Sequence, residues 1–143
     1  LMLFDSWASA VPAAQRDWLV TKPARAIVEG VRKNGHNQPI IGFPKGIGEG
    51  LIRYAAESGV DAIGLDHGVD PVWAGQNLPA QMPVQGNLDP VSLLNAGTEM
   101  FRDIDHILDA FNDRPHIFNL GHGITPPTPV ENVQKMIDHI RNR

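Results

Sequence analysis

Short apolar runs alternate with helix-patterned stretches along the whole chain. The runs are mainly apolar rather than alternating, which is typical of parallel strands that are buried on both faces. The five runs with the length of a strand are residues 1–4, 39–43, 61–65, 83–87 and 116–120. A stretch with apolar residues at helical spacing follows each of them. The pattern therefore predicts five consecutive strand–helix units and an α/β fold.

Local capping signals indicate where several of these helices begin. Asp70 and Asp89 are each followed by a proline, and this pair is typical of an N-cap and a first helical residue. Thr128 is predicted to cap the last helix, with Pro129 as its first residue and Glu131 three residues after the cap. One helix is expected after Asp89, with an apolar face formed by Met100, Ile104, Ile107, Leu108 and Phe111. The last helix is expected to bury Val130, Val133, Met136, Ile137 and Ile140.

The fifth apolar run ends in the sequence Gly121-His122-Gly123. His122 is therefore expected where a strand passes into a loop, between two glycines that tolerate positive φ. In strand–helix folds, ligands bind at this end of the strands. The alternative is a tight turn that carries a surface histidine, and the motif alone does not separate the two interpretations.

Composition excludes several classes of function. A formal net charge of −4 gives no electrostatic footprint for nucleic acid or an anionic membrane. No run approaches the ~18 apolar residues of a membrane span. The chain has no cysteine, and its six histidines lack the spacing of metal ligands, so neither a disulfide nor a metal site is predicted.

The 143 residues fit one domain without an internal linker, so residues 1–143 are expected to form a single domain. Two architectures suit five strand–helix units: an open five-stranded α/β sheet, or five units of a (β/α)₈ barrel. A barrel would require about three further units before Leu1. Because Leu1 opens directly into an apolar run, the chain is expected to be a piece of a longer one.

Five motifs at the predicted strand ends share one resemblance. They are Leu3-Phe4-Asp5-Ser6-Trp7, Ile40-Ile41-Gly42-Phe43-Pro44-Lys45-Gly46, Gly59-Val60-Asp61-Ala62-Ile63-Gly64-Leu65-Asp66, Val84-Gln85-Gly86-Asn87-Leu88-Asp89-Pro90 and Asn119-Leu120-Gly121-His122-Gly123-Ile124. Together they resemble the C-terminal portion of the uroporphyrinogen decarboxylase family. The resemblance implies a (β/α)₈ TIM barrel, of which this chain would supply the last five units. It also implies a cytoplasmic, homodimeric lyase of porphyrin biosynthesis, which converts uroporphyrinogen III to coproporphyrinogen III without metal or cofactor.

The resemblance assigns roles to three residues of this chain. His122 matches the family histidine that contacts a substrate carboxylate, and Ser6 matches a hydroxyl that donates a hydrogen bond to substrate. Phe4 is expected to line the same cavity. The family's arginine cluster, its pyrrole-binding aspartate and a tyrosine belong to the N-terminal portion, so no catalytic residue is assigned here. The chain alone is therefore expected to be inactive.

Two other functions remain open at this point. A corrinoid-related methyltransferase of the same superfamily would hold zinc through histidine and cysteine, and this chain has no cysteine. A non-enzymatic half-barrel, used for binding or assembly, would explain the missing arginine cluster. Among the polar residues at strand ends, Asp66 has no evident partner in the sequence, and Lys45 and His67 receive no role.

Overall fold

The computed structural model describes residues 1–143, and its centre is a five-stranded parallel sheet. The strands are β1 Met2–Asp5, β2 Ile41–Pro44, β3 Ala62–Gly64, β4 Val84–Leu88 and β5 His116–Leu120. Each apolar run expected from the sequence contributes one strand, with boundaries that shift by one or two residues. Neighbouring strands pair in parallel along the whole sheet, and the longest ladder joins β4 to β5.

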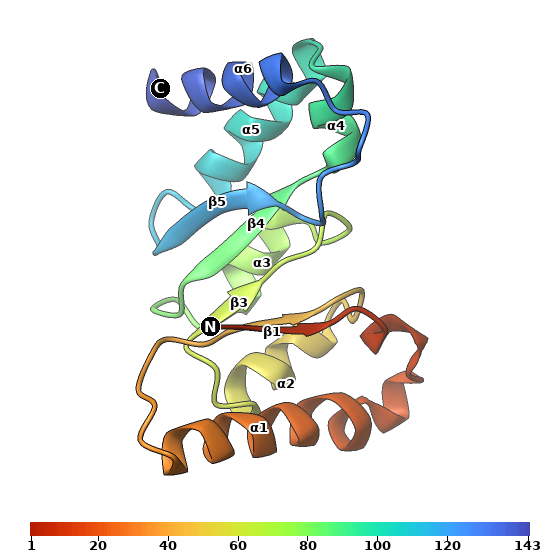
Figure 1. Ribbon diagram of the computed structural model, residues 1–143, viewed down its shortest axis with the longest axis vertical. Coiled ribbons are helices and arrows are strands. Elements are labelled where there is room, and N and C mark those ends of the chain that lie inside the picture. Colours follow the sequence, from red (N-terminus) through yellow and green to blue (C-terminus); the bar gives the residue numbers. More distant parts are fainter.

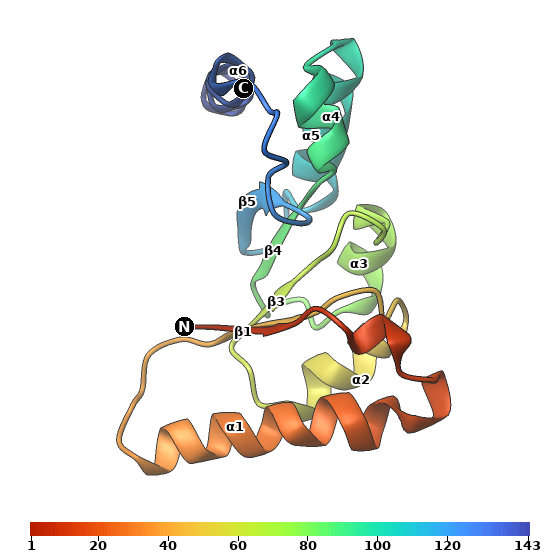
Figure 2. The ribbon, with the colours of Figure 1, turned by 45° about the vertical axis from the view of Figure 1, so that its right-hand side comes forward.

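The order of the strands distinguishes the two architectures left open by the sequence. The order is sequential, β1-β2-β3-β4-β5, whereas a doubly wound sheet reverses direction at a switch point and carries helices on both faces. Figure 1 shows the strongly twisted sheet. Figure 2 shows α3, α4 and α5 on one side of it, α1 and α2 below and α6 above β5, while no helix lies on the other side next to β1 and β3. This is the arrangement of five units of a (β/α)₈ barrel, with its helices outside.

Six α-helices connect or follow the strands. They are α1 Lys22–Lys33, α2 Gly50–Glu57, α3 Pro71–Asn77, α4 Pro90–Asn95, α5 Thr98–Ala110 and α6 Val130–Arg141. The segment between β1 and α1 also contains the short helices η1 Ala8–Ala10, η2 Ala13–Gln15 and η3 Asp17–Thr21. The prediction of a single helix after Asp89 is wrong. The expected helix divides into α4 and α5 because Ala96 adopts a left-handed conformation, with φ of 46°, and Gly97 follows it in an extended one.

Two of the three predicted N-caps are confirmed. The Asp70 carboxylate accepts a hydrogen bond from Trp73 N at 2.8 Å, and the Asp89 carboxylate accepts one from Val91 N at 2.8 Å. Thr128 does not cap α6, because its hydroxyl pairs with that of Thr125 at 2.8 Å. The helix begins one residue later than predicted, with Pro129 in the capping position and no side-chain bond to the first turn.

The hydrophobic core lies between the sheet and its helices and contains 22 buried residues. The inner strands β2, β3 and β4 are largely buried, as the apolar runs predicted, but β1 and β5 are half-exposed because each pairs on one edge only. The expected burial of Val130 is wrong, since 78% of it is exposed, and the other four expected residues of α6 are half-buried. Asn132 is the buried residue of α6, and its amide donates to Leu93 O and Leu94 O at the end of α4.

None of the helices of this chain has the length and apolar content of a membrane span. No group of three or more His, Asp and Glu side chains is arranged to hold a metal ion.

Candidate active site

A cavity of about 510 Å³ is lined by residues of the strands and of the loops after them, and by no residue of a helix. All five strands, or the residues directly after them, contribute to its wall. The lining residues are Met2, Phe4, Ser6, Phe43, Leu65, Gln85, Asn119, Leu120, His122, Gly123 and Ile124. In a (β/α)₈ barrel this position is the interior beneath the C-terminal ends of the strands, where barrel enzymes bind their substrates.

The structure brings the three residues predicted from the sequence into this one cavity. Ser6 follows the end of β1, and His122 stands two residues after the end of β5, so both lie at the C-terminal rim of the sheet. Phe4 lies within β1, and its ring is 63% exposed and meets the ring of Phe43 edge-on at 5.9 Å between centroids. Because β1 and β5 are the outermost strands, Ser6 and His122 stand on opposite sides of the cavity. Their roles in binding stay predictions.

Two amide side chains in the cavity wall escaped the sequence analysis. Gln85 lies in β4 with its Nε2 3.8 Å from Met2 Sδ, and Asn119 lies in β5 with its Oδ1 accepting from Leu120 N at 2.8 Å. Each is a polar residue within a strand. In β4, which is largely buried, a polar side chain is the signal that could have identified Gln85, because a buried strand carries one only where it has a partner or a ligand. Asn119 is exposed on the edge strand β5, so its position gave no such signal.

The cavity wall is apolar with a few polar groups, as in most small-molecule sites. It contains no lysine, arginine or carboxylate, so His122 is the one lining residue that can carry a positive charge. Two groups with shifted pKa values, Tyr54 and His116, lie outside the wall. Burial, with the Asp5 charge adding to it, raises the pKa of Tyr54 to about 12.

His116 is the other perturbed group, and it faces the helix layer. Its ring packs 4.7 Å from that of Phe111 between centroids, and its Nε2 lies 2.7 Å from Gly86 O. Burial lowers the pKa of His116, the bond to Gly86 O opposes this, and the Arg114 charge adds to the lowering. His116 is therefore a neutral structural residue rather than a candidate acid.

The Gly-His-Gly motif has a different physical basis from the one expected. Neither glycine beside His122 adopts positive φ, so that reason for their presence is wrong. A Cβ on Gly121 would lie 2.2 Å from His67 N and 2.6 Å from His67 Cα, whereas a Cβ on Gly123 would meet nothing within 4 Å. Gly121 N also donates to Leu88 O at 2.8 Å, which extends the β4–β5 ladder. The backbone after β3 therefore fixes the backbone that presents His122.

Asp66 has partners that the sequence did not reveal, so that expectation is also wrong. The residue is 8% exposed and directly follows Leu65, one of the cavity residues. Its carboxylate accepts hydrogen bonds from Gly46 N at 2.8 Å and from Gly68 N at 3.0 Å. Asp66 thus joins the loop after β2 to the turn after β3.

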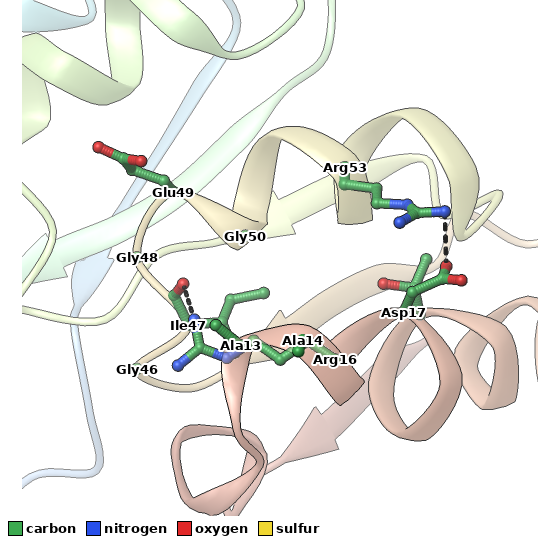
Figure 3. Close-up of a pocket in the computed structure, with 11 residues that line it drawn as sticks. Ala13, Ala14, Arg16, Asp17, Gly46, Ile47, Gly48, Glu49, Gly50 and Arg53 are labelled. Carbon is green, nitrogen blue, oxygen red and sulfur yellow. Dashed lines mark hydrogen bonds and ion pairs between the residues drawn. The ribbon is translucent and has the colours of Figure 1, made fainter.

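A second cleft, of about 610 Å³, lies between the segment before α1 and the loop after β2 (Figure 3). Its charged groups are used within the protein. Arg16 donates to Ile47 O at 2.8 Å, and Arg53 Nη2 lies 3.1 Å from Asp17 Oδ1. Figure 3 shows Glu49 directed away from both arginines. Two cations and two carboxylates balance in this cleft, so it is a junction between elements rather than an anion site.

The chain matches known proteins over its whole length. The family described as uroporphyrinogen decarboxylase (URO-D) matches residues 1–143. Proteins named uroporphyrinogen decarboxylase from Novosphingobium aromaticivorans, Sphingopyxis alaskensis and Maricaulis maris are 51%, 52% and 50% identical to it. These alignments cover 99%, 99% and 100% of this chain and 41% of each relative. The chain therefore spans less than half the length of these relatives.

Proposed function

This chain belongs to the uroporphyrinogen decarboxylase family, and from this premise we propose that it forms part of an enzyme that decarboxylates uroporphyrinogen III. The four acetate side chains lose carbon dioxide and become methyl groups, which gives coproporphyrinogen III for porphyrin biosynthesis. Residues 1–143 supply the last five units of one barrel domain, and a preceding segment supplies the others, about three in number. The cavity on the inner face of these units is the proposed substrate site.

The proposed reaction needs no carbanion-stabilising cofactor. Protonation of an electron-rich pyrrole at its α-carbon gives a cation that is conjugated with the carbon bearing the acetate. That cation accepts the electron pair released when the bond to carbon dioxide breaks, which leaves an exocyclic methylene. A proton added to this methylene gives the methyl group, and loss of the proton from the α-carbon restores the pyrrole, so the substrate is its own electron sink. The protein must supply a proton, anchors for the carboxylates and stabilisation of the cation.

The roles proposed for three residues follow from their chemistry and from their common cavity. His122, with ring N–H groups at the rim, anchors a substrate carboxylate. Ser6, on the opposite side, donates a hydrogen bond from its hydroxyl. Phe4, an exposed residue of β1 that lines the same wall, packs against the pyrrole faces. The single observation that carries the proposal is that all three line one cavity in a chain of this family.

The charge of the cavity supports the view that this chain alone is inactive. The substrate carries eight carboxylates, which arginine side chains bind best through paired hydrogen bonds. The cavity wall contains no arginine or lysine. The preceding segment is therefore proposed to supply an arginine cluster together with the aspartate that holds the pyrrole N–H groups.

The assembled enzyme is proposed to be a cytoplasmic homodimer with the mouths of its two barrels facing each other. Trp7, which directly follows Ser6 at the rim, is 80% exposed and is a residue that such an interface would cover. Sedimentation of the full-length protein at micromolar concentration tests this, and a monomer there would contradict it.

The decisive experiment compares the full-length protein with the 143-residue chain. Each is incubated anaerobically with uroporphyrinogen III, and the products are oxidised and separated by the number of carboxyl groups that they retain. Coproporphyrin is expected from the full-length protein, with and without a chelator, and no product from the chain alone. Failure of the full-length protein to remove any carboxyl group would refute the proposal. Loss of turnover with the chelator would instead favour the zinc-dependent methyltransferase.

A further inference from the structure

Asp66 occupies the centre of the strand-end loops without touching the cavity. Its two carboxylate oxygens accept from different loops, Oδ2 from Gly46 N and Oδ1 from Gly68 N. A carboxylate that accepts two backbone N–H groups makes charge-assisted bonds, which are stronger than bonds between neutral groups. One side chain therefore holds two loops at a fixed separation.

The first loop leads to Ser6. A Cβ on Gly46 would lie 2.7 Å from Ser9 Cβ, so the loop after β2 lies in close contact with η1, which begins two residues after Ser6. Next to Gly46, Lys45 N donates to Asp5 O at 3.0 Å. The residues on both sides of Ser6 are thus in contact with the loop that Asp66 holds.

The second loop leads to His122. Gly68 N bonds to the Asp66 carboxylate, and Val69 N donates to Asp66 O at 3.1 Å, which closes a turn around His67. The backbone of His67 in turn contacts Gly121, where no Cβ fits. His122 is the next residue, so the position of this turn sets the position of the His122 backbone.

Asn87 locks the same turn from behind. The residue is 4% exposed, and its Nδ2 donates to Asp66 O at 3.0 Å and to Val69 O at 2.7 Å. Both carbonyls belong to the turn around His67. Because Asn87 lies in β4, its two hydrogen bonds attach the turn to the sheet.

We propose that Asp66 is a positioning residue that holds the Ser6 and His122 loops in register across the mouth of the cavity. This inference rests on the proposed function, in which Ser6 and His122 bind the same substrate. A displacement of about 1 Å at a binding group can cost roughly 100-fold in rate. Asp66 therefore contributes to catalysis through both residues, although it meets neither the substrate nor the cavity.

The test is a set of double-mutant cycles in the full-length protein. Asp66→Asn is nearly isosteric but replaces one acceptor oxygen by a donor, so one of the two loops is released. It is expected to lower kcat/KM by roughly 10- to 100-fold. Combined with His122→Asn or Ser6→Ala, it should cost less than it does in the wild-type background, because one of the two groups that it positions is already gone.

Phe4→Leu is the matched control, because β1 pairing rather than a loop holds Phe4 in place. The losses in kcat/KM caused by Asp66→Asn and by Phe4→Leu should multiply, to within about threefold, in the double variant. Equal losses from Asp66→Asn in all backgrounds would show a general loss of folded protein and would overturn the proposal. If Asp66→Asn does not fold, Asn87→Ser tests the same turn, since it keeps both bonds to the carboxylate and removes the two amide donations.

Amide hydrogen exchange tests the positioning without any substrate. In Asp66→Asn, exchange at Gly121 should become at least ~10-fold faster, while Ile63, which donates to Pro83 O inside the sheet, should be unchanged. Equal acceleration at both amides, or none at Gly121, would overturn the proposal. A full-length protein that does not decarboxylate uroporphyrinogen III would refute the proposed function, and the exchange result would still decide whether Asp66 holds Gly121.

Discussion

Substitution of Gly121 by alanine tests the packing of the loop that presents His122. The new Cβ would lie 2.2 Å from His67 N, and ordinary contact begins at 3.4 Å, so the two backbones must separate by about 1.2 Å. The new Cβ is attached rigidly to its backbone, and the atoms that it meets are backbone atoms of His67. The clash therefore cannot be relieved by the rotation of a side chain.

The size of the effect follows from two opposing contributions. Overpacking of this kind costs about 1–3 kcal/mol, and loss of the bond from Gly121 N to Leu88 O costs about 0.5–1.5 kcal/mol more. The reduced freedom of the unfolded chain returns about 0.4–1 kcal/mol. We expect Gly121→Ala to lower the free energy of unfolding by roughly 0.5–4 kcal/mol and kcat/KM by up to ~100-fold, because His122 moves with its neighbour.

Gly123→Ala is the matched control on the other side of His122. Its Cβ would meet nothing within 4 Å and its φ is not positive, so the change should stay within about 0.5 kcal/mol. Urea denaturation of the full-length proteins, followed by circular dichroism, measures both variants, and decarboxylation measures the displacement of His122. Equal effects of the two substitutions, or a stable and fully active Gly121→Ala protein, would refute the reasoning.

The remaining predictions concern binding, pH and helix capping. His122→Asn should cost ~1.5–3 kcal/mol, or roughly 10- to 150-fold in kcat/KM, with partly decarboxylated intermediates accumulating. Ser6→Ala should cost only ~0.5–1.5 kcal/mol, and the reverse ranking in steady-state assays would contradict these roles. Because the folded-state pKa of His116 is lowered, its contribution to stability is present above pH ~6.5 and lost as the pH falls below it; urea midpoints should show less of this loss in His116→Gln. Asp70→Ala should lower stability by ~0.5–2 kcal/mol, whereas Thr128→Ala, which removes no cap, should stay within about 0.5 kcal/mol in the same assay.

The features predicted correctly from sequence are those set by neighbouring residues. The apolar run of residues 39–43 predicts the buried inner strand β2, because its burial pattern is local. Asp70 and Asp89 accept hydrogen bonds from backbone N–H groups only three and two residues further along the chain. Both partners of each cap are therefore close together in the sequence. The predicted cap at Thr128 failed although its partners were equally close in the sequence, because its hydroxyl pairs with that of Thr125 instead.

The features that were missed depend on contacts between distant parts of the chain. Asp66 accepts from Gly46, twenty residues before it, and Gly121 contacts His67, more than fifty residues before it. The half-exposure of β5 follows from its place at the edge of the sheet, which its own residues do not encode. The family motifs identified Ser6 and His122 as candidates, but the reason for Gly121 required the fold.

The sequential strand order also determines when the barrel can close during synthesis. Each strand from β2 to β5 pairs with the strand made just before it, so these ladders can form as the chain leaves the ribosome. The free edge of β5 is different, because in a closed barrel its partner is the strand synthesised first. Until that pairing forms, the exposed edge is open to strands of other nascent chains. Slow closure of β5 onto that first strand would therefore prolong the interval in which this barrel is most prone to misassembly.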